Sequence, residues 1–351
     1  MNFTKTLGKW YKENKRDLPW RRTTDPFKIW VSEIILQQTR IVQGWDYYLR
    51  FLERFPDVRS LAEADEHDVL KLWQGLGYYS RARNMHVAAR EIMNVYKGVF
   101  PKTYDEIRKL KGIGDYTAAA ISSIAFEISV PVVDGNVLRF FSRFFGIIEP
   151  VDTQKGKIAI FERAKENIDR QHPGDFNQAI MEFGALQCKP VPDCTVCPFE
   201  TRCMAFRENR VAEYPVKSKK QDQRKRYFNY LFIPSQKGET TSVFLNKRTG
   251  KDIWRNLFDF PSIETEKATT LKKLMVSKEW KDLFGERKVK FVKESKTYRH
   301  ILSHQIIHAK FYTLEVEESV VLPFLRVQLN DLRTYPIPRL IERYLEEVVN
   351  W

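Results

Sequence analysis

Residues 110–121 read Leu-Lys-Gly-Ile-Gly-Asp-Tyr-Thr-Ala-Ala-Ala-Ile, and the stretch that follows leads to Val-Val-Asp-Gly-Asn over residues 132–136. Two glycines one residue apart, Gly112 and Gly114, favour a tight hairpin whose backbone can approach a ligand closely. The amide groups beyond Gly114 begin a helix, and a helix start attracts phosphate. Asp134 lies where an N-cap begins another helix. The two glycines alone could form an ordinary connection between helices, and Asp134 alone could be an ordinary helix cap. The pair indicates a functional site only when it is considered with the rest of the chain.

The composition sets the broad class of protein. The chain has 351 residues, room for two domains, and its 59 Lys and Arg against 45 Asp and Glu leave a net charge of +14. That excess favours a polyanionic partner, nucleic acid ahead of an anionic membrane, although basic solvated faces are common. No apolar run approaches the roughly 18 residues that span a bilayer, and the N-terminus lacks the apolar region of a signal peptide. We therefore expect an intracellular protein with no membrane partner.

All four cysteines lie in one short segment, spaced Cys188-x5-Cys194-x2-Cys197-x5-Cys203. A disulfide framework would spread its cysteines through the fold, so this cluster indicates a metal site. Four thiolates can hold either tetrahedral zinc or a 4Fe-4S cluster. A zinc ribbon normally has two Cys-x2-Cys pairs and this segment has one, which favours the iron–sulfur cluster.

The period of the apolar residues changes along the chain. Up to about residue 187 they recur at helical spacing with short connections, which is typical of an all-α domain. Residues 217–226 are charged and lack apolar side chains, which predicts a linker. Beyond it, Tyr312, Leu314 and Val316 alternate with polar residues as in a half-buried strand, and a C-terminal amphipathic helix follows. The second domain is therefore expected to be α+β.

Candidate functional side chains precede the hairpin. Glu33 has apolar neighbours at positions 31, 34, 35 and 36 of a predicted helix, and burial would raise its pKa and suit it to act as a general acid. An exposed glutamate on the polar edge of that helix is the alternative. Trp20 is either a core anchor or a platform for a base, and the amides of Gln37 and Gln38 suit base edges. The run Gly-Leu-Gly-Tyr-Tyr at 75–79 offers an aromatic wedge for DNA or, alternatively, a buried tyrosine pair.

Together and in this order, these motifs resemble the adenine DNA glycosylase family (MutY type) of the helix-hairpin-helix superfamily, to which endonuclease III also belongs. The resemblance covers nearly the whole chain. It implies a mostly α fold: a two-lobed helix-hairpin-helix glycosylase domain with a four-cysteine metal loop over residues 1–215, a basic linker over 216–226, and an α+β nudix-like domain over 227–351 that recognises 8-oxoguanine. The implied substrate is double-stranded DNA with adenine mispaired with 8-oxoguanine or guanine, and the implied product is an abasic site. A monomer in the bacterial cytoplasm is expected.

The resemblance also implies roles for individual residues. Glu33 matches the general acid that protonates the flipped adenine, and Asp134 matches the carboxylate that stabilises the cationic sugar, as glycosidic cleavage requires. Asn136 orients a catalytic carboxylate, and Tyr116 faces the sugar. The residues expected to contact the adenine, the duplex or the 8-oxoguanine are Leu18, Trp20, Arg21, Leu36, Gln37, Gln38, Tyr78, Gly112, Gly114, Leu302, Ser303 and His304. The four cysteines match the ligands of a 4Fe-4S cluster.

Tyr116 distinguishes this chain within the superfamily. Relatives resembling endonuclease III carry a Schiff-base lysine two residues after the second glycine of the hairpin, and this chain has Tyr116 there. We therefore predict a monofunctional glycosylase that uses water as its nucleophile. A glycosylase of the same fold for another lesion, and a non-catalytic iron–sulfur DNA-binding or redox protein, are the alternatives.

Three positions depart from the pattern of the family. The first gap between cysteines is five residues where six are usual, Lys111 stands where proline is usual, and Leu302 replaces a phenylalanine. The first bears on cluster binding, the second on the hairpin turn, and the third removes an aromatic ring from the loop that is expected to recognise 8-oxoguanine.

Overall fold

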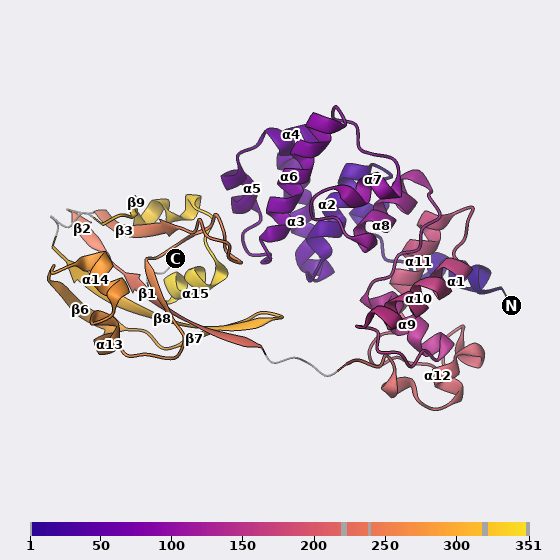
Figure 1. Cartoon of the computed structure of the whole chain (residues 1–351). Helices are drawn as coiled ribbons and strands as arrows, with labels where there is room; N and C mark the ends of the chain where they lie inside the picture. Colours follow the sequence, from indigo (N-terminus) through magenta and orange to yellow (C-terminus); the bar gives the residue numbers. More distant parts are fainter. Residues whose placement is uncertain (1, 219–222, 238–239, 318–321, 349–351) are drawn as a thin grey trace. The chain divides into compact units, whose positions relative to one another are not determined.

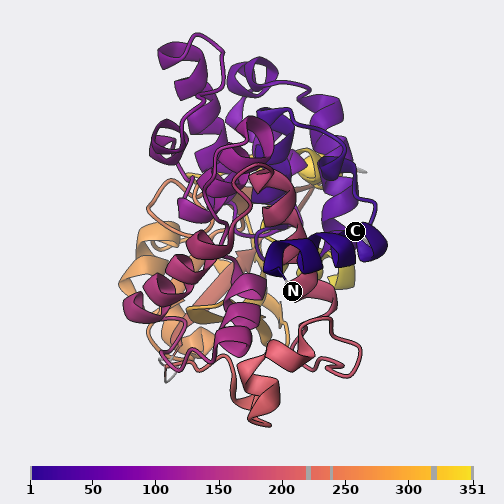
Figure 2. The ribbon, with the colours of Figure 1, turned by 90° about the vertical axis from the view of Figure 1, so that its right-hand side faces the viewer.

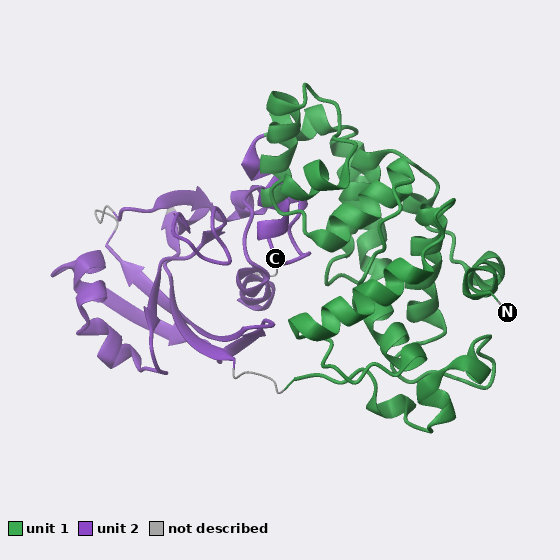
Figure 3. Ribbon diagram, turned by 45° about the vertical axis from the view of Figure 1, so that its right-hand side comes forward, with its two compact units in different colours: residues 1–64, 84–220 green, residues 65–83, 221–351 purple. Residues whose placement is uncertain are grey.

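A computed structural model describes residues 2–218, 223–237, 240–317 and 322–348. The chain forms two compact units (Figure 3). Unit 1 comprises residues 1–64 and 84–220, and unit 2 comprises residues 65–83 and 221–351. Part of the predicted linker, residues 219–222, lies outside the described residues. The strand β1 begins at Arg224, within the segment predicted as linker, and the domain boundaries at 215 and 227 stay predictions.

Unit 1 is helical (Figure 1). Its elements are α1 (Phe3–Asn14), η1 (Pro19–Arg21), α2 (Pro26–Leu36), α3 (Ile41–Arg54), α4 (Val58–Glu63), α6 (Ser80–Val95, of which residues 80–83 belong to unit 2), α7 (Tyr104–Lys109), α8 (Asp115–Phe126), α9 (Gly135–Phe145), α10 (Gln154–Asn167), α11 (Pro173–Leu186), η2 (Glu200–Arg202), α12 (Met204–Arg207) and η3 (Val211–Glu213). Helix α4 ends at Glu63 and a separate helix, α5, begins at Glu66, because Ala64 has extended backbone.

The core of unit 1 positions the segment that ends at Asp134. Helix α11 packs on α1, α8 and α9 (Figure 2), around a cluster of rings that includes Phe3, Phe140, Phe144, Phe183 and Phe199. Such rings bury large apolar areas and dominate the energetics of a core. The buried Asn177 of α11 donates to the Ser123 hydroxyl and the Val130 carbonyl at 2.8 Å each, and it accepts from the Val132 amide at 3.1 Å. These bonds satisfy a buried amide and fix the backbone just before Asp134.

Unit 2 is α+β, as predicted. A five-stranded sheet has the order β5-β1-β8-β6, with β7 also paired to β8, and β1 runs parallel to β8. A second sheet has the order β2-β3-β4, with β9 also paired to β3. The elements are α5 (Glu66–Leu72), β1 (Arg224–Phe232), β2 (Ser235–Lys237), β3 (Thr240–Lys247), β4 (Phe258–Asp259), β5 (Ser262–Thr265), α13 (Leu271–Met275), α14 (Lys278–Phe284), β6 (Val289–Glu294), β7 (Tyr298–Ile301), β8 (Gln305–Val316), β9 (Leu325–Gln328), η4 (Leu329–Thr334) and α15 (Arg339–Val348).

Residues 65–83 belong to unit 2 although they precede it by far in the chain. The Tyr79 hydroxyl donates to the Ile337 carbonyl at 3.3 Å, and the Lys71 ammonium donates to the Tyr335 carbonyl at 3.2 Å. The ring of His67 lies 5.8 Å from that of Tyr335 and 6.0 Å from that of Phe258. Nothing in the local sequence of α5 predicts these long-range contacts.

Across the ranges that the structure describes, no helix is both long enough and apolar enough to cross a membrane.

Candidate active site

A cavity of about 590 Å³ in unit 1 is lined by residues of η1, α2, α8, α9, α11 and their connections. It brings together ten of the residues singled out from the sequence, from segments more than 100 residues apart. They are Leu18, Trp20, Arg21, Glu33, Leu36, Gln37, Gln38, Tyr116, Asp134 and Asn136. The reading of Trp20 as a core anchor is confirmed, because its side chain is buried against Tyr48 with ring centroids 5.4 Å apart. Trp20 also lines the cavity, and its role as a platform for a base stays a prediction.

Glu33 lies on the buried face of α2, so the alternative of an exposed glutamate is wrong. Burial raises its pKa to about 7, helped by the negative charge of Asp134 and opposed by the Tyr116 hydrogen bond and by Arg21. The Tyr116 hydroxyl donates to Glu33 Oε2 at 2.6 Å, which fixes the orientation of the carboxyl group. Glu33 can therefore hold a proton near neutral pH inside the cavity, which is the property of a general acid.

Asp134 caps α9, as the sequence predicted. Its Oδ1 accepts from the backbone amides of Asn136 at 2.9 Å and Val137 at 2.8 Å, and its Oδ2 accepts from the Asn136 side-chain amide at 2.8 Å. Burial raises the pKa of Asp134, and these three hydrogen bonds act to lower it. The capping bonds hold the carboxylate in one place at the cavity wall.

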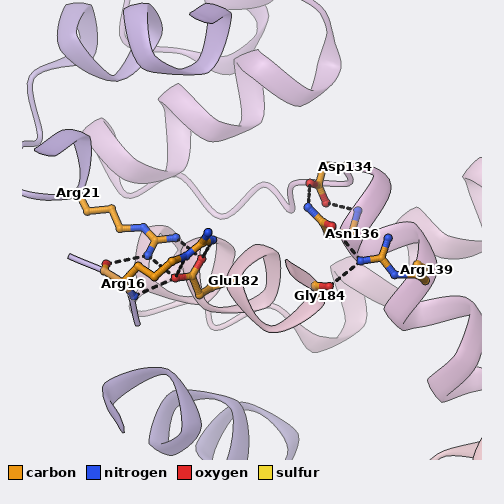
Figure 4. A network of polar contacts seen from close by, with 7 residues as sticks. All are labelled: Arg16, Arg21, Asp134, Asn136, Arg139, Glu182 and Gly184. Carbon is orange, nitrogen blue, oxygen red and sulfur yellow. Dashed lines mark hydrogen bonds and ion pairs between the residues drawn. The ribbon is translucent and has the colours of Figure 1, made fainter. Parts of the chain in front are cut away.

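Hydrogen bonds connect Asp134 through Asn136 to Arg139 (Figure 4), and Arg139 in turn contacts the start of the cysteine segment. Arg139 donates to Asn136 Oδ1 at 2.9 Å and to the carbonyls of Gly184 at 2.6 Å and Cys188 at 2.8 Å. Asn136 thus has partners on both sides of its amide group, and its conformation is tied to the backbone where the cysteine segment begins.

Gly184 allows α11 to approach Asn136 closely. A Cβ at this position would lie 2.7 Å from the Cβ and the carbonyl oxygen of Asn136. We expect Gly184→Ala to lower the thermal unfolding midpoint, because overpacking of a tight contact costs about 1–3 kcal/mol. Gly8→Ala is the matched control, since no described atom lies within 4 Å of a Cβ built there in α1. Equal unfolding midpoints for the two variants would contradict this prediction.

Sequence reasoning missed several residues of the cavity wall. Arg16, Gln178, Met181 and Glu182 line it with the predicted residues. Gln178 and Glu182 are spaced i, i+4 on α11, a helix otherwise rich in buried apolar side chains. Two polar residues on one face of an otherwise apolar helix were the feature of the sequence that could have identified Gln178 and Glu182 as cavity residues.

The hairpin lies outside this cavity. Gly112 has a φ of 82°, and a Cβ there would lie 2.5 Å from Asn84 Cβ, so the turn requires glycine on both grounds. Gly114 is the N-cap residue of α8, which begins at Asp115 as predicted. Lys111, Gly112 and Gly114 are exposed, so backbone amides at this helix start are accessible to a phosphate.

Tyr78 and Gln38 share an uncommon backbone conformation. Their φ angles are 47° and 59°, in the left-handed region that residues other than glycine seldom adopt. Such backbone concentrates at functional sites. Tyr78 belongs to unit 2, between the left-handed Gly77 and the buried Tyr79, and 37% of it is exposed. The alternative of a buried tyrosine pair therefore applies to Tyr79 and not to Tyr78.

The loop that joins β7 to β8 contains Leu302, Ser303 and His304. Gln223, which precedes β1, donates to the carbonyls of Leu302 at 2.8 Å and Ser303 at 3.2 Å. This clamp fixes the backbone of the loop, while Ser303 and His304 are exposed.

The four cysteines are free thiols that line a second, small cavity of unit 1 together with Phe140 and Arg143. Arg143 donates to Cys188 Sγ at 3.6 Å and to the carbonyls of Lys189 and Pro190 at 2.8 and 2.9 Å. Burial raises the pKa of all four thiols, to about 12 for Cys197. Within the described ranges, no group of three or more His, Cys, Asp or Glu side chains is arranged to hold a metal ion.

Comparisons with known proteins agree with this arrangement. A family model described as HhH-GPD superfamily base excision DNA repair protein matches residues 31–168, and a NUDIX domain model matches residues 230–347. An adenine DNA glycosylase of Buchnera aphidicola subsp. Schizaphis graminum is 34% identical over 313 residues, which cover 87% of this chain and 85% of the relative. An adenine DNA glycosylase of Mus musculus is 41% identical over 215 residues, which cover 58% of this chain and 42% of that relative.

Two solved structures have a similar fold over 59% of this chain. A thermostable thymine-DNA glycosylase superposes with a TM-score of 0.55 at 28% identity, covering 59% of this chain and 95% of that one. Endonuclease III in a non-covalent DNA complex superposes with a TM-score of 0.51 at 20% identity, covering 59% of this chain and 94% of that one, which shows a common fold.

Proposed function

The chain belongs to the adenine DNA glycosylase family, and we propose that it hydrolyses the N-glycosidic bond of adenine mispaired with 8-oxoguanine or guanine in double-stranded DNA. As a member of this family it is a DNA N-glycosylase of base excision repair. The observation that carries the proposed mechanism is the placement of Glu33, with a pKa of about 7, on the same cavity as the Asp134 carboxylate.

The two carboxyl groups divide the chemistry. Glu33 donates its proton to the adenine, which makes the base a leaving group, and Asp134 stabilises the positive charge that develops on the sugar. Asn136 orients Asp134 through the 2.8 Å bond, and Tyr116 orients Glu33. Water is the nucleophile, because the position of a Schiff-base lysine is occupied by Tyr116. The adenine flips out of the duplex into the cavity, as base chemistry in DNA requires.

The remaining predicted residues recognise the DNA. Leu18, Trp20 and Arg21 form the wall of the adenine pocket with Leu36 and Gln37, and the hairpin at Gly112 and Gly114 binds backbone phosphate. Gln38 and Tyr78 fill or wedge the duplex near the orphan base, which is the partner that the flipped adenine leaves behind. The loop of Leu302, Ser303 and His304 contacts the 8-oxoguanine, and Gln223 holds that loop.

The cysteine segment is proposed to hold a 4Fe-4S cluster through Cys188, Cys194, Cys197 and Cys203. All four thiols line one cavity, which supports a single group held by the four. A zinc ribbon normally has two Cys-x2-Cys pairs and this segment has one, which favours the iron–sulfur cluster over zinc. Iron and acid-labile sulfide in the purified protein would support this assignment, and stoichiometric zinc would contradict it. The protein is further proposed to act as a monomer in the bacterial cytoplasm.

The decisive experiment is single-turnover excision from duplexes that hold adenine opposite 8-oxoguanine, guanine or thymine. We expect excision from the first two and none from the adenine–thymine pair. Borohydride should trap no covalent adduct, since no lysine takes part. Excision of oxidised pyrimidines without excision of adenine would assign the protein to another lesion and reject the proposal.

The excision rate should depend on pH through Glu33. Its pKa is raised to about 7, so the acid is protonated below that pH and loses its proton above it. We expect the single-turnover rate to fall as pH rises through about 7, approaching tenfold per pH unit at higher pH. Rates measured between about pH 5 and pH 9 test this expectation, and a rate that increases through neutrality would contradict the role of Glu33 as the acid.

A further inference from the structure

Glu182 is a buried carboxylate that the proposed chemistry does not use. It lies on α11 at the wall of the active-site cavity, and only 1% of its side chain is exposed. Its two oxygens accept hydrogen bonds from the backbone amide and the guanidinium of Arg16, and from both terminal nitrogens of Arg21 at 2.8 Å each (Figure 4). Burial acts to raise its pKa, but the bonds from Arg16 and Arg21 lower it to about 2. Glu182 is therefore ionised in the folded protein.

The contacts of Glu182 determine where the Arg21 guanidinium lies. Arg21 also donates to the Arg16 carbonyl at 3.1 Å and lies over the Tyr11 ring at 5.7 Å. These bonds use three of the five N–H donors that a guanidinium has, and the other two have no partner among the described residues. A bidentate pair fixes both the position and the plane of the guanidinium. Arg21 is thereby held at the cavity wall, and two of its N–H groups remain able to donate to a ligand.

Glu182 also pairs with Arg21, the guanidinium whose charge lowers the pKa of Glu33. The ionisable groups that interact with Glu33 are Tyr116 from α8, Asp134 at the start of α9, and Arg21 from η1. Arg16 and Glu182 line the same cavity. Without Glu182, two guanidiniums would face the cavity with no neutralising partner. Their field would favour the ionised form of Glu33 and oppose a base that gains a proton.

We propose that Glu182 is a positioning residue, which holds Arg21 at the adenine pocket and offsets the charges of Arg16 and Arg21 so that Glu33 keeps its proton for catalysis. This inference rests on the proposed function, because it assigns Glu182 a part in the same site. The reaction remains the hydrolysis, in which the glycosidic C–N bond breaks and a C–O bond from water forms, and Glu182 acts on it through Arg21 and the charge near Glu33.

The test compares Glu182→Gln with Arg16→Met in the full-length protein. Glu182→Gln removes a negative charge and retains the side-chain shape, so the excision rate at neutral pH should fall at least tenfold and the midpoint of its pH profile should move to lower pH. Arg16→Met removes a positive charge from the same cluster, so that midpoint should move to higher pH. Glu182→Asp should restore the midpoint, since it restores the charge. Glu166→Gln, an exposed partner of Arg163 outside the cavity, is the control for loss of a glutamate.

Each outcome decides the proposal. A loss of rate with an unmoved midpoint and no rescue by Glu182→Asp would show a purely structural role and overturn it, as would equal shifts in the two charge variants. If Glu182→Gln does not fold, Arg16→Met still tests whether the midpoint of the pH profile moves to higher pH. Glu182→Asp still tests whether a carboxylate at position 182 keeps the midpoint at the unmodified value. If the unmodified protein does not excise adenine, the proposed function fails. In that case the pKa of the Glu33 carboxyl is measured by NMR in the unmodified protein and in Glu182→Gln, with Glu33→Gln to assign the signal. This measurement tests the inference without relying on excision.

Discussion

Glu33→Gln is expected to reduce adenine excision from the 8-oxoguanine mispair by about 10²–10⁴-fold, the contribution typical of a positioned general acid. The amide has the shape of the protonated carboxyl group but cannot release a proton to the adenine. Since Glu33 is buried on α2, the neutral amide also suits its surroundings, and the fold should be retained. Binding of the mispair should remain close to that of the unmodified protein, because the hairpin at Gly112 and Gly114 and the loop of Leu302, Ser303 and His304, which are proposed to bind the DNA, are untouched.

The measurement pairs single-turnover rates with equilibrium binding to the same duplex. Glu53→Gln on the exposed face of α3 is a matched control and should excise adenine at the unmodified rate. If Glu33→Gln remained fully active, proton donation by Glu33 would be rejected. If binding and excision fell together, the loss would belong to the DNA interface instead.

Asp134→Asn separates the two roles of Asp134. Asparagine caps helices about as well as aspartate, so the bonds to the amides of Asn136 and Val137 can be kept while the negative charge is lost. We expect excision to fall by about 10²-fold or more, as when one electrostatic group is removed from a preorganised site. Asp134→Ala should show this loss and should also destabilise the fold by about 0.5–2 kcal/mol through the missing cap.

The control is another capping aspartate outside the site. Asp57 caps α4 and accepts from the Ser60 amide at 2.8 Å, so Asp57→Ala should reduce the thermal unfolding midpoint and leave excision unchanged. An Asp134→Asn protein with the unmodified rate would show that Asp134 acts through its cap alone.

The charges around Glu33 explain why Asp134→Asn should also affect proton donation by Glu33. Asp134 raises the pKa of Glu33 while Arg21 and the Tyr116 hydrogen bond lower it, so each neighbour affects proton donation. Asn136 and Arg139 then connect Asp134 to the Cys188 carbonyl. A change in the cysteine segment can therefore reach Asp134, the proposed catalytic carboxylate, through the side chains of Arg139 and Asn136.

Local features of the sequence were sufficient for several elements. The hairpin at Gly112, the start of α8 at Asp115 and the cap at Asp134 depend on interactions within a few residues, so the residue types alone predict them. The change from helical period to strand alternation likewise depends on adjacent positions, and it predicted the α+β second unit. Ten of the cavity residues could be singled out from the sequence because their motifs occur together in one family.

Only the tertiary structure decided which of those residues are buried, paired or protonated. Glu33 is a candidate acid because burial and a bond from Tyr116, 83 positions away, set its pKa. The sequence could not reveal that Glu182 pairs with Arg16 across 166 positions, or that residues 65–83 belong to unit 2. Burial and pairing of charges depend on which distant segments meet, whereas caps and periodicity depend on neighbours along the chain. The sequence therefore determined which groups are present, and the packing determined which of them holds a proton.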